Sequence, residues 1–422
     1  MCGLVAVIRK SKTSNDELSN IVKLGLDQIR HRGPDGSNIW INEASNVGLG
    51  HVRLAIVGIE SGSQPMSLVD GTTIAFNGEI YNYIELREEL GINKFKTTSD
   101  TEVILHAYKK WGSDCVDHLR GMFSFVIWDA QKKKTFFARD RFGIKPLYYF
   151  SAKNESIYFA SEVKALLPFM DSRKIDKNAL SDYFSFQFTI GENTLLENVK
   201  QIMPGHIGWI DNSNKVQIKK YWDVQYDLDF DHSEEYFVDG IKNLIEESTR
   251  LHMRADVEIG AYVSGGLDSS LLAQLGSSFR SNKNTSFKIF HGKFNEGEKF
   301  DESKFAKDLA DENSMDLHLT NITEQDFADS ISNVIYHLDT PVAGPGSFPQ
   351  YMVSKEASKN LKVVFGGQGG DEIFGGYSRY LIAYFEKCIQ GGIEGTLNDG
   401  NFIVSYESIL PNLEALKPYK PL

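Results

Sequence analysis

Cysteine is scarce in this sequence, since only Cys2, Cys115 and Cys388 occur among 422 residues. Three widely separated cysteines in a long chain form no disulfide framework, and their spacing does not match a zinc site. The ten histidines likewise lack a metal-binding spacing such as HExxH. So few cysteines fit a reducing compartment, and we predict a cytoplasmic protein.

The chain also lacks an excess of positive charge, because its formal net charge is -12. Nucleic acids and anionic membranes attract basic proteins, so neither is an expected partner. Long apolar runs are missing too, and stretches such as residues 122–128 are far shorter than a membrane span. The apolar start of the chain ends at Arg9 with no basic region before it, which does not fit a signal peptide.

Neither an internal repeat nor a low-complexity tract interrupts the chain, and its 41% apolar and 24% charged residues are typical of a folded protein. Its length predicts two or three domains. Short apolar-alternating runs bounded by Gly, Asn and Asp dominate residues 2–195. We expect strands at 48–57, 72–76, 123–128 and 156–160, and helices at 16–30, 83–90 and 100–111. These patterns predict an α+β layered domain.

The pattern changes after residue 195. Residues 196–232 contain Met203-Pro204-Gly205, a polar turn and an acidic run, so we interpret them as the connection between domains. We expect helices at 233–253, 269–275, 300–313 and 350–360, and strands at 259–263, 286–290 and 362–365. This alternation predicts an α/β domain with a doubly wound parallel sheet over residues 233–422.

Cys2 stands directly before an apolar run that predicts a buried strand. If Met1 is removed, which is easy before a small residue, Cys2 carries both a thiol and a free α-amino group. The thiolate is a nucleophile and the amine can serve as its base, so no separate histidine is needed. A chance cysteine in front of a first strand is the alternative.

Residues 264–270 read Ser-Gly-Gly-Leu-Asp-Ser-Ser and lie between a predicted strand and a predicted helix. The glycines let the backbone approach a ligand closely, and the amides of the helix start form an anion site. This loop is not a Walker motif, because no Gly-Lys-Ser/Thr follows the required spacing. Asp268 would repel a phosphate unless Mg²⁺ bridges them, which makes it a candidate magnesium ligand. A Gly-Gly turn with a serine or aspartate helix cap is the alternative.

A second glycine-rich loop follows a predicted strand and has six glycines among residues 366–376. In a doubly wound sheet, two such loops lie at the carboxyl edge, where ligands bind. Asp371 in this loop is therefore the second candidate ligand of Mg²⁺. So many glycines are hard to explain structurally, because each raises the entropy of the unfolded chain, although a purely structural turn stays open.

Polar residues at strand ends and helix starts mark the first half of the chain. An amino-acid substrate needs an anion for its ammonium group, such as Asp100, and a cation for its carboxylate, such as Arg53. Asn77 and Gly78 would donate to the oxyanion that forms when a thiolate attacks a side-chain amide. Taken singly, Arg53 and Asp100 also fit a surface ion pair or a helix cap, so the argument depends on the whole set.

Motifs in both halves resemble one enzyme family. Class II glutamine amidotransferases have motifs similar to Cys2-Gly3-Leu4 and to residues 30–36, 53–57, 76–82, 99–102 and 140–149. Adding residues 264–270 and 367–377 makes essentially the whole chain resemble glutamine-hydrolysing asparagine synthetase. The resemblance implies an N-terminal nucleophile (Ntn) hydrolase of αββα sandwich fold, followed by a PP-loop ATP pyrophosphatase domain. Amidophosphoribosyltransferases and glucosamine-phosphate synthases share the first half only.

The resemblance implies a role for each matched residue. Cys2 is the nucleophile, and glutamine is bound by Arg53, Asn77, Gly78, Glu79 and Asp100, with Asn77 and Gly78 in the oxyanion hole. The ATP-binding positions are Ser264, Gly265, Gly266, Leu267, Asp268, Ser269, Ser270, Ile289, Gly366 and Gly367. The Mg²⁺ ligands are Asp268 and Asp371. The substrates are glutamine, aspartate and ATP, and a homodimer is compatible with the family.

The chain departs from the family pattern at three places. Gln368 stands where the family commonly has an acidic residue tied to formation of a β-aspartyl-AMP intermediate. Residues 338–346 contain glycines where many relatives have an Asp-Pro-Ser sequence. The sequence stops at Leu422, before the family's catalytic lysine and its Arg-Val-Pro-Phe motif. We therefore expect an incomplete PP-loop domain that makes little or no asparagine.

The function that we expect is glutamine hydrolysis at Cys2 coupled to amidation of an adenylated aspartate, which gives asparagine, AMP and pyrophosphate. One alternative keeps this chemistry but uses another carboxylate acceptor, such as a sugar acid of a surface polysaccharide, because of Gln368. Another alternative is a glutaminase or regulatory fragment without synthetase activity.

Overall fold

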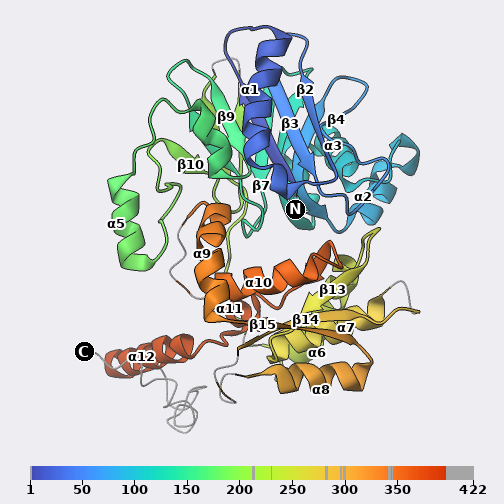
Figure 1. Cartoon of the computed structure of the whole chain (residues 1–422), viewed down its shortest axis with the longest axis vertical. Coiled ribbons are helices and arrows are strands. Elements are labelled where there is room, and N and C mark those ends of the chain that lie inside the picture. Colours follow the sequence, from blue (N-terminus) through green and yellow to red (C-terminus); the bar gives the residue numbers. More distant parts are fainter. Residues whose placement is uncertain are drawn as a thin grey trace.

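The computed structural model describes residues 2–211, 214–229, 231–280, 284–294, 297, 301–340, 344 and 346–395. Figure 1 shows two bodies, one above the other, with the N-terminus on the side of the upper body that faces the lower one. We call the upper body, through Lys220, the first domain and the lower body, from Glu234, the second domain. Among the described residues, no helix has the length and apolarity needed to span a membrane.

Two antiparallel sheets form the centre of the first domain. Within the described residues, one sheet has the order β10-β8-β9-β1-β3-β2 and the other has the order β12-β11-β7-β6-β5-β4. The strands of the first are β1 (Gly3–Ile8), β2 (Gly36–Ile41), β3 (Val47–Arg53), β8 (Tyr148–Ser151), β9 (Ile157–Ala160) and β10 (Val199–Gln201). Those of the second are β4 (Met66–Ser67), β5 (Thr73–Ile80), β6 (Gly121–Asp129), β7 (Lys134–Arg139), β11 (His206–Ile210) and β12 (Val216–Lys220).

The two sheets pack face to face, and helices cover their outer faces. Leu4 and Leu49 of one sheet meet Val126 and Phe137 of the other in one buried cluster. Outside, α1 (Asn15–Gln28) packs on β1 and β3, while α3 (Asp100–Trp111) packs on β5. The remaining helices are α2 (Tyr83–Leu90), α4 (Cys115–His118), α5 (Lys177–Phe186) and 3₁₀ turns at Arg30–Arg32, Ile92–Lys94, Gly112–Asp114 and Val163–Phe169. This is the predicted αββα sandwich.

Most of the predicted elements of the first domain are confirmed. The helix expected at 100–111 is α3, and Ser99 caps it by accepting a hydrogen bond from the Thr101 amide. The strand expected at 48–57 ends early, at Arg53. It ends there because the next amides, those of Leu54 and Ala55, donate to Cys2 Sγ and to the carboxylate of Asp35 instead of a neighbouring strand.

The segment predicted as the connection, residues 196–232, contributes three strands to these sheets. β10 pairs with β8, β11 pairs with β7, and β12 pairs with β11. Its short runs between turn residues carry little periodicity, so strand pairing with the rest of the domain decides their conformation. The domain limits at residues 195 and 233 stay predictions.

The second domain has a parallel sheet in the order β15-β14-β13-β16, counted over the described residues. Its strands are β13 (Ile259–Tyr262), β14 (Lys288–Phe294), β15 (Asp316–Ile322) and β16 (Val363–Phe365). Its helices are α6 (Glu234–His252), α7 (Leu267–Phe279), α8 (Ser303–Asn313), α9 (Glu324–Leu338), α10 (Ser347–Ala357), α11 (Gly370–Phe374) and α12 (Ser378–Glu394). Ala273 and Ala306 cover one face of the sheet, and Val334 and Met352 cover the other. The domain is thus the predicted doubly wound α/β fold.

Four elements of the second domain were not predicted: β15, α9, α11 and α12. Exposed and half-buried residues alternate irregularly along β15, which is the edge strand of the sheet, so its apolar pattern is weak. A capping box does mark the start of α9, because Thr323 and Asp326 cap each other reciprocally. Residues 396–422, which belong to the predicted PP-loop domain, lie outside the described part of the chain.

The packing between the two sheets generates a stability prediction. Phe137 is fully buried and its ring lies 4.8 Å from that of Phe159. Phe137→Ala should lower the free energy of unfolding by about 4 kcal/mol, because it leaves a cavity between the sheets. The matched control is Phe184→Ala, since Phe184 is 77% exposed on α5 and should change stability by less than about 0.5 kcal/mol. Equal effects in urea unfolding would contradict this packing.

Candidate functional site

Cys2 lies at the end of β1, a strand whose six residues are all buried. β1 pairs with β3 on one side and with β9 on the other. Cys2 Sγ accepts a hydrogen bond from the Leu54 amide at 3.3 Å. Burial raises the pKa of the Cys2 thiol, the Leu54 hydrogen bond lowers it, and the carboxylates of Glu79 and Asp100 raise it further. The thiol is therefore held rigidly but needs help to ionise.

The backbone of Cys2 is held by a buried ionic network that crosses between the domains. Arg32 Nε donates to the Cys2 carbonyl at 2.8 Å, and Arg32 Nη1 lies 2.7 Å from Glu162 Oε1. Lys164 bonds Glu162 and also Asp339 of the second domain, the latter at 2.8 Å. Burial acts to raise the pKa of Glu162, but His31, Lys164 and Arg32 together lower it to about 2.

Sequence reasoning gave no role to this network. The only available signals were charged residues, Glu162 and Lys164, inside an otherwise apolar stretch, and pairs distant in sequence had to meet for them to matter. Asp339 belongs to the stretch 338–346 that departs from the family pattern. Residues 341–343 and 345 of that stretch lie outside the described residues.

Asn77 and Gly78 lie on β5, in the sheet that faces β1. Asn77 is fully buried, yet neither its side-chain oxygen nor its nitrogen has a hydrogen-bond partner among the described residues. An unpaired buried amide is costly, so it marks a position where a ligand can bind. At Gly78 a Cβ would lie 2.1 Å from the Met122 carbonyl oxygen, so only glycine fits.

Glu79 and Asp100 are neighbouring acidic groups near the thiol. Burial raises the pKa of Asp100 to about 6, although the amides of Ile80 and Thr101 hydrogen-bond it. Burial also raises the pKa of Glu79 well above its ordinary value, and the charge of Asp100 raises it further. Asp100 is 4% exposed. An acidic pair of this kind, with Asp100 buried and Glu79 half-buried, is suited to bind a cation, which would relieve the repulsion between them.

Lys145 is a buried cation near these groups and was not predicted as a site residue. Burial and the charge of Arg32 lower the pKa of Lys145 to about 8, while Glu79, Asp140 and Cys2 act to raise it. Its backbone is fixed, because its amide donates to Asp140 at 3.0 Å. The residue lies within the family motif at 140–149, but a single lysine among apolar neighbours gives no further signal.

Arg53 is the last residue of β3 and directly precedes Leu54, whose amide donates to Cys2 Sγ. Its guanidinium donates to the carbonyls of Ile59 at 2.8 Å and Gly58 at 2.6 Å. It also acts on Glu79, whose pKa it lowers in part. Arg53 therefore lies with the other predicted glutamine residues, and it shapes the loop that follows it as well.

The loop Ser264–Ser270 joins β13 to α7, as predicted. Gly265 has φ of +91°, a conformation that favours glycine. The hydroxyls of Ser264 and Ser269 lie 3.0 Å apart, and the Ser264 amide donates to Ser269 Oγ. Gly266 caps α7 without a side chain, which leaves the first amides of this helix open to an anion.

The second glycine-rich loop follows β16, the neighbour of β13, and touches the first loop. A Cβ on Gly367 would lie 3.0 Å from the Ser269 nitrogen, and one on Gly370 would lie 2.2 Å from Asp268 Oδ2. The Asp268 carboxylate therefore reaches the loop that carries Asp371. Among the described residues, no three or more His, Cys, Asp or Glu side chains are grouped to hold a metal. The Asp371 carboxylate lies against Gly376 of its own loop, so these contacts bring Asp268 to the second loop without joining the two carboxylates. Both are ligands of the type that Mg²⁺ accepts together with phosphate oxygens and water.

Other residues that were predicted to bind the nucleotide differ in their surroundings. Leu267 is 83% exposed at the start of α7, whereas Ile289 is fully buried in the core between the sheet and its covering helices. The side chain of Gln368 folds back over Gly366, and its amide nitrogen lies 3.3 Å from Gln350 Oε1. Ser270 lies on the first turn of α7.

Comparison with known proteins covers both domains. A family model described as a glutamine amidotransferase domain matches residues 1–222, and a model described as asparagine synthase matches residues 240–413. "Asparagine synthetase (glutamine-hydrolyzing) 1" of Bacillus subtilis is 39% identical over 391 residues, which cover 90% of this chain and 59% of that protein. "Putative asparagine synthetase (glutamine-hydrolyzing) 2" of Methanocaldococcus jannaschii is 36% identical over 410 residues, which cover 91% and 77%. "Amidase chry2" of Gibberella zeae is 32% identical over 405 residues, which cover 90% and 60%.

The raised pKa of Asp100 predicts a pH-dependent difference in stability. A carboxyl whose pKa rises from 3.8 to about 6 on folding binds protons more tightly in the folded state, so its contribution to stability falls as the pH rises through that window. Asp100→Asn should therefore stabilise the protein at pH 8 by up to about 3 kcal/mol, and far less at pH 4. Urea unfolding of both proteins at both pH values measures this. An Asp100→Asn variant that is less stable than the wild type at pH 8 would show that the Asp100 carboxylate does not destabilise the fold.

Proposed function

Because the chain belongs to the family of glutamine-hydrolysing asparagine synthetases, we propose that its two sites are those that make asparagine from aspartate, ATP and the amide nitrogen of glutamine. The observation that carries this proposal is the arrangement around Cys2. A thiol held by the Leu54 amide, a buried Asn77 with no hydrogen-bond partner among the described residues, and the acidic pair of Glu79 and Asp100 are brought together from β1, β5 and α3. The other half of the reaction rests on the two touching glycine-rich loops of the second domain.

The first step that we propose is attack of the Cys2 thiolate on the side-chain amide carbon of glutamine. With Met1 removed, the α-amino group of Cys2 takes the thiol proton and then gives it to the departing nitrogen, which leaves as ammonia. The oxyanion of the tetrahedral intermediate would accept hydrogen bonds from the Asn77 side chain and the Gly78 amide. Water then hydrolyses the thioester and releases glutamate. Lys145 adds positive charge beside the thiolate.

We propose that glutamine is oriented through its α-amino and α-carboxylate groups. Asp100 and Glu79 would hold the ammonium, whose charge would offset the burial that raises the pKa of both carboxyls and the charge of Asp100 that raises that of Glu79 further. Arg53 would attract the carboxylate. Protonation of Asp100 below about pH 6 would then weaken glutamine binding.

In the second domain, we propose that ATP binds with its pyrophosphate portion on residues 264–270, beside Gly366 and Gly367. Asp268 and Asp371 would hold Mg²⁺, which supplies positive charge to the phosphate oxygens. A carboxylate oxygen of aspartate attacks the α-phosphorus, and pyrophosphate leaves. Ammonia then attacks the aspartyl carbonyl, and AMP leaves with the bonding pair.

We also propose a cytoplasmic location, which the free thiols at Cys2, Cys115 and Cys388 support.

The nature of the acceptor is the least constrained part of this proposal. Gln368 cannot act as a base, and its side chain lies against Gly366 and Gln350. We propose aspartate as the acceptor because of the family. Comparing aspartate with glutamate and with uronic acids in ATP-dependent AMP release tests the alternative directly.

The proposed nucleophile leads to a prediction for Cys2→Ala. Glutamine hydrolysis should fall to background, because no thiolate remains to form the thioester. Any asparagine formation from added ammonia should persist, since the nucleotide loops are unchanged. Glutamate release and asparagine are measured with glutamine or ammonium as nitrogen donor.

The control for this prediction is the mass of the purified wild-type protein. Removal of Met1 should accompany glutaminase activity. An active enzyme that retains Met1 would show that the α-amino group of Cys2 is not the base. Wild-type glutaminase activity in Cys2→Ala would exclude the thiol as nucleophile.

The proposed magnesium ligands lead to a second prediction. Asp268→Asn and Asp371→Asn should each lower the rate of aspartate-dependent ATP–pyrophosphate exchange by about a hundredfold, because one of two charged ligands is lost. Glutamine hydrolysis without nucleotide should stay unchanged. Raising the Mg²⁺ concentration should restore part of the exchange. Normal exchange in either variant at low Mg²⁺ would remove that residue from the site.

A further inference from the structure

Residues 54–58, which follow β3, form a segment that joins the thiol to the second domain. At one end, the Leu54 amide donates to Cys2 Sγ. At the other end, the Gly58 amide donates to Asp256 Oδ2 at 2.8 Å, and the Asp256 amide donates to the Ile56 carbonyl at 3.0 Å. One residue of the second domain thus binds this segment through both its side chain and its backbone.

A second residue of the other domain acts on the same segment through Asp35. Lys362 Nζ lies 2.8 Å from Asp35 Oδ2, and that oxygen also accepts the Ala55 amide at 2.7 Å. Burial acts to raise the pKa of Asp35, but the hydrogen bonds from Lys362 and Ala55 outweigh it, so the pKa is lowered. The carboxylate therefore stays ionised and bridges Lys362 to the segment.

These two residues stand at the amino ends of the strands that carry the nucleotide loops. Asp256 lies three residues before β13, and Lys362 directly precedes β16. The two strands pair in parallel, with Ile259 opposite Val363. Their carboxyl ends continue into the loops at Ser264 and Gly366. The strand pair β13–β16 therefore connects the nucleotide loops with residues 54–58 beside the thiol.

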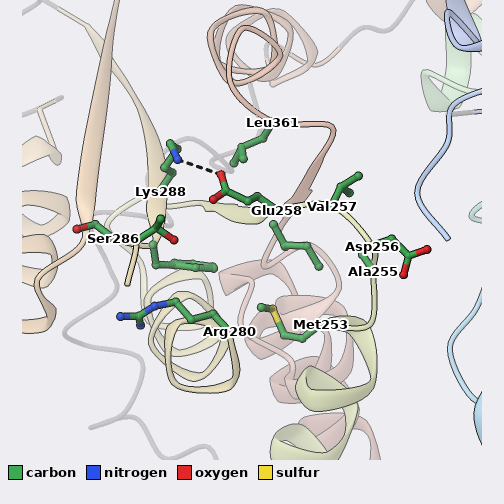
Figure 2. A pocket seen from close by; sticks show the side chains of 12 residues that line it. Met253, Ala255, Asp256, Val257, Glu258, Arg280, Ser286, Lys288 and Leu361 are labelled. Atoms are coloured by element: carbon green, nitrogen blue, oxygen red, sulfur yellow. Dashed lines mark hydrogen bonds and ion pairs between the residues drawn. The ribbon is translucent and has the colours of Figure 1, made fainter. Parts of the chain in front are cut away.

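Figure 2 shows the residues around the amino end of β13 from close by. A cavity of about 250 Å³ lies between the amino ends of these strands, lined by residues such as Met253, Arg280 and Leu361. The Asp256 side chain points out of this cavity, toward the ribbon of the first domain. The Asp256 carboxylate therefore contacts the first domain, at the Gly58 amide, and does not fill the cavity.

We infer that Asp256 and Lys362 are positioning residues of the glutaminase site, contributed by the synthetase domain. They hold residues 54–58 so that the Leu54 amide stays at Cys2 Sγ and Arg53 stays in its loop. This inference deepens the proposed function and rests on it. Neither residue touches the reacting atoms, so their loss should affect glutamine binding more than the chemical step.

The test uses the full chain and glutamine hydrolysis without nucleotide. Asp256→Ala and Lys362→Met should each raise KM for glutamine about tenfold, the effect of losing one charge-assisted hydrogen bond, and should change kcat less than about twofold. Asp256→Asn keeps an oxygen that can accept the Gly58 amide, so it should lie close to the wild type. This rescue separates positioning from a general loss of structure.

The matched control is Glu247→Gln, which removes another ion pair between the domains. Glu247 Oε1 lies 2.6 Å from Nη1 of Arg120 in the first domain. Its KM should equal that of the wild type, and thermal unfolding should show all variants folded. Unchanged KM in Asp256→Ala and Lys362→Met, or an equal rise in Glu247→Gln, would overturn the inference. A wild type that releases no glutamate would instead overturn the proposed function itself, and the inference with it.

The same connection should transmit nucleotide binding. Coupling between two sites is reciprocal, so a ligand at the loops that shifts β13 and β16 must change glutamine affinity. Mg-ATP with aspartate should therefore change KM for glutamine in the wild type, and this change should disappear in Asp256→Ala. Transmission through these strands would be contradicted if Mg-ATP with aspartate changed KM by the same factor in both proteins, or if KM of the wild type did not change.

Discussion

The pairing of β1 with β3 and β9 is the constraint on which the rest of the structure depends. All six residues of β1 are buried, so the strand cannot shift without exposing apolar surface on both of its faces. Cys2 is therefore held at the end of a rigid strand, facing the sheet that supplies Asn77. A thiol on a flexible N-terminus would lose this alignment.

The acidic and polar groups around the thiol lower the stability of the fold, because burial disfavours their charged or unpaired states. This loss of stability suggests that they serve to bind a ligand. Asp100 is buried and Glu79 is half-buried, and the carboxylates of both disfavour ionisation of the thiol. Asn77 is buried with no partner among the described residues. Folding alone would favour apolar side chains at these positions. A bound substrate with an ammonium group and a polarised amide would satisfy all three, which is how we understand their presence.

The two domains are held together by charge pairs that reach the site from two directions. The Arg32–Glu162–Lys164–Asp339 network meets the Cys2 carbonyl, and Asp256 meets the segment at the Cys2 sulfur. Buried ion pairs contribute little net stability, because desolvation offsets their attraction. Their geometry is specific, however, so they define how the second domain sits against the glutaminase site.

The sequence alone was sufficient to predict the features that depend on local residue patterns. The period of apolar residues predicted α1, α2, α3 and both sheet types, and glycine-rich loops between a strand and a helix predicted where phosphate would bind. Cys2, Asn77 and Asp100 were predicted because each stands within a motif, with Cys2 directly before a strand and Asp100 at the start of a helix. Only the tertiary structure could decide the rest: that β3 ends at Arg53, that β10 to β12 join the sandwich, that Lys145 is buried near the thiol, and that Asp256 and Lys362 contact Gly58 and Asp35. These features depend on pairs far apart in the chain, and no local periodicity records which strands and charges will meet after folding.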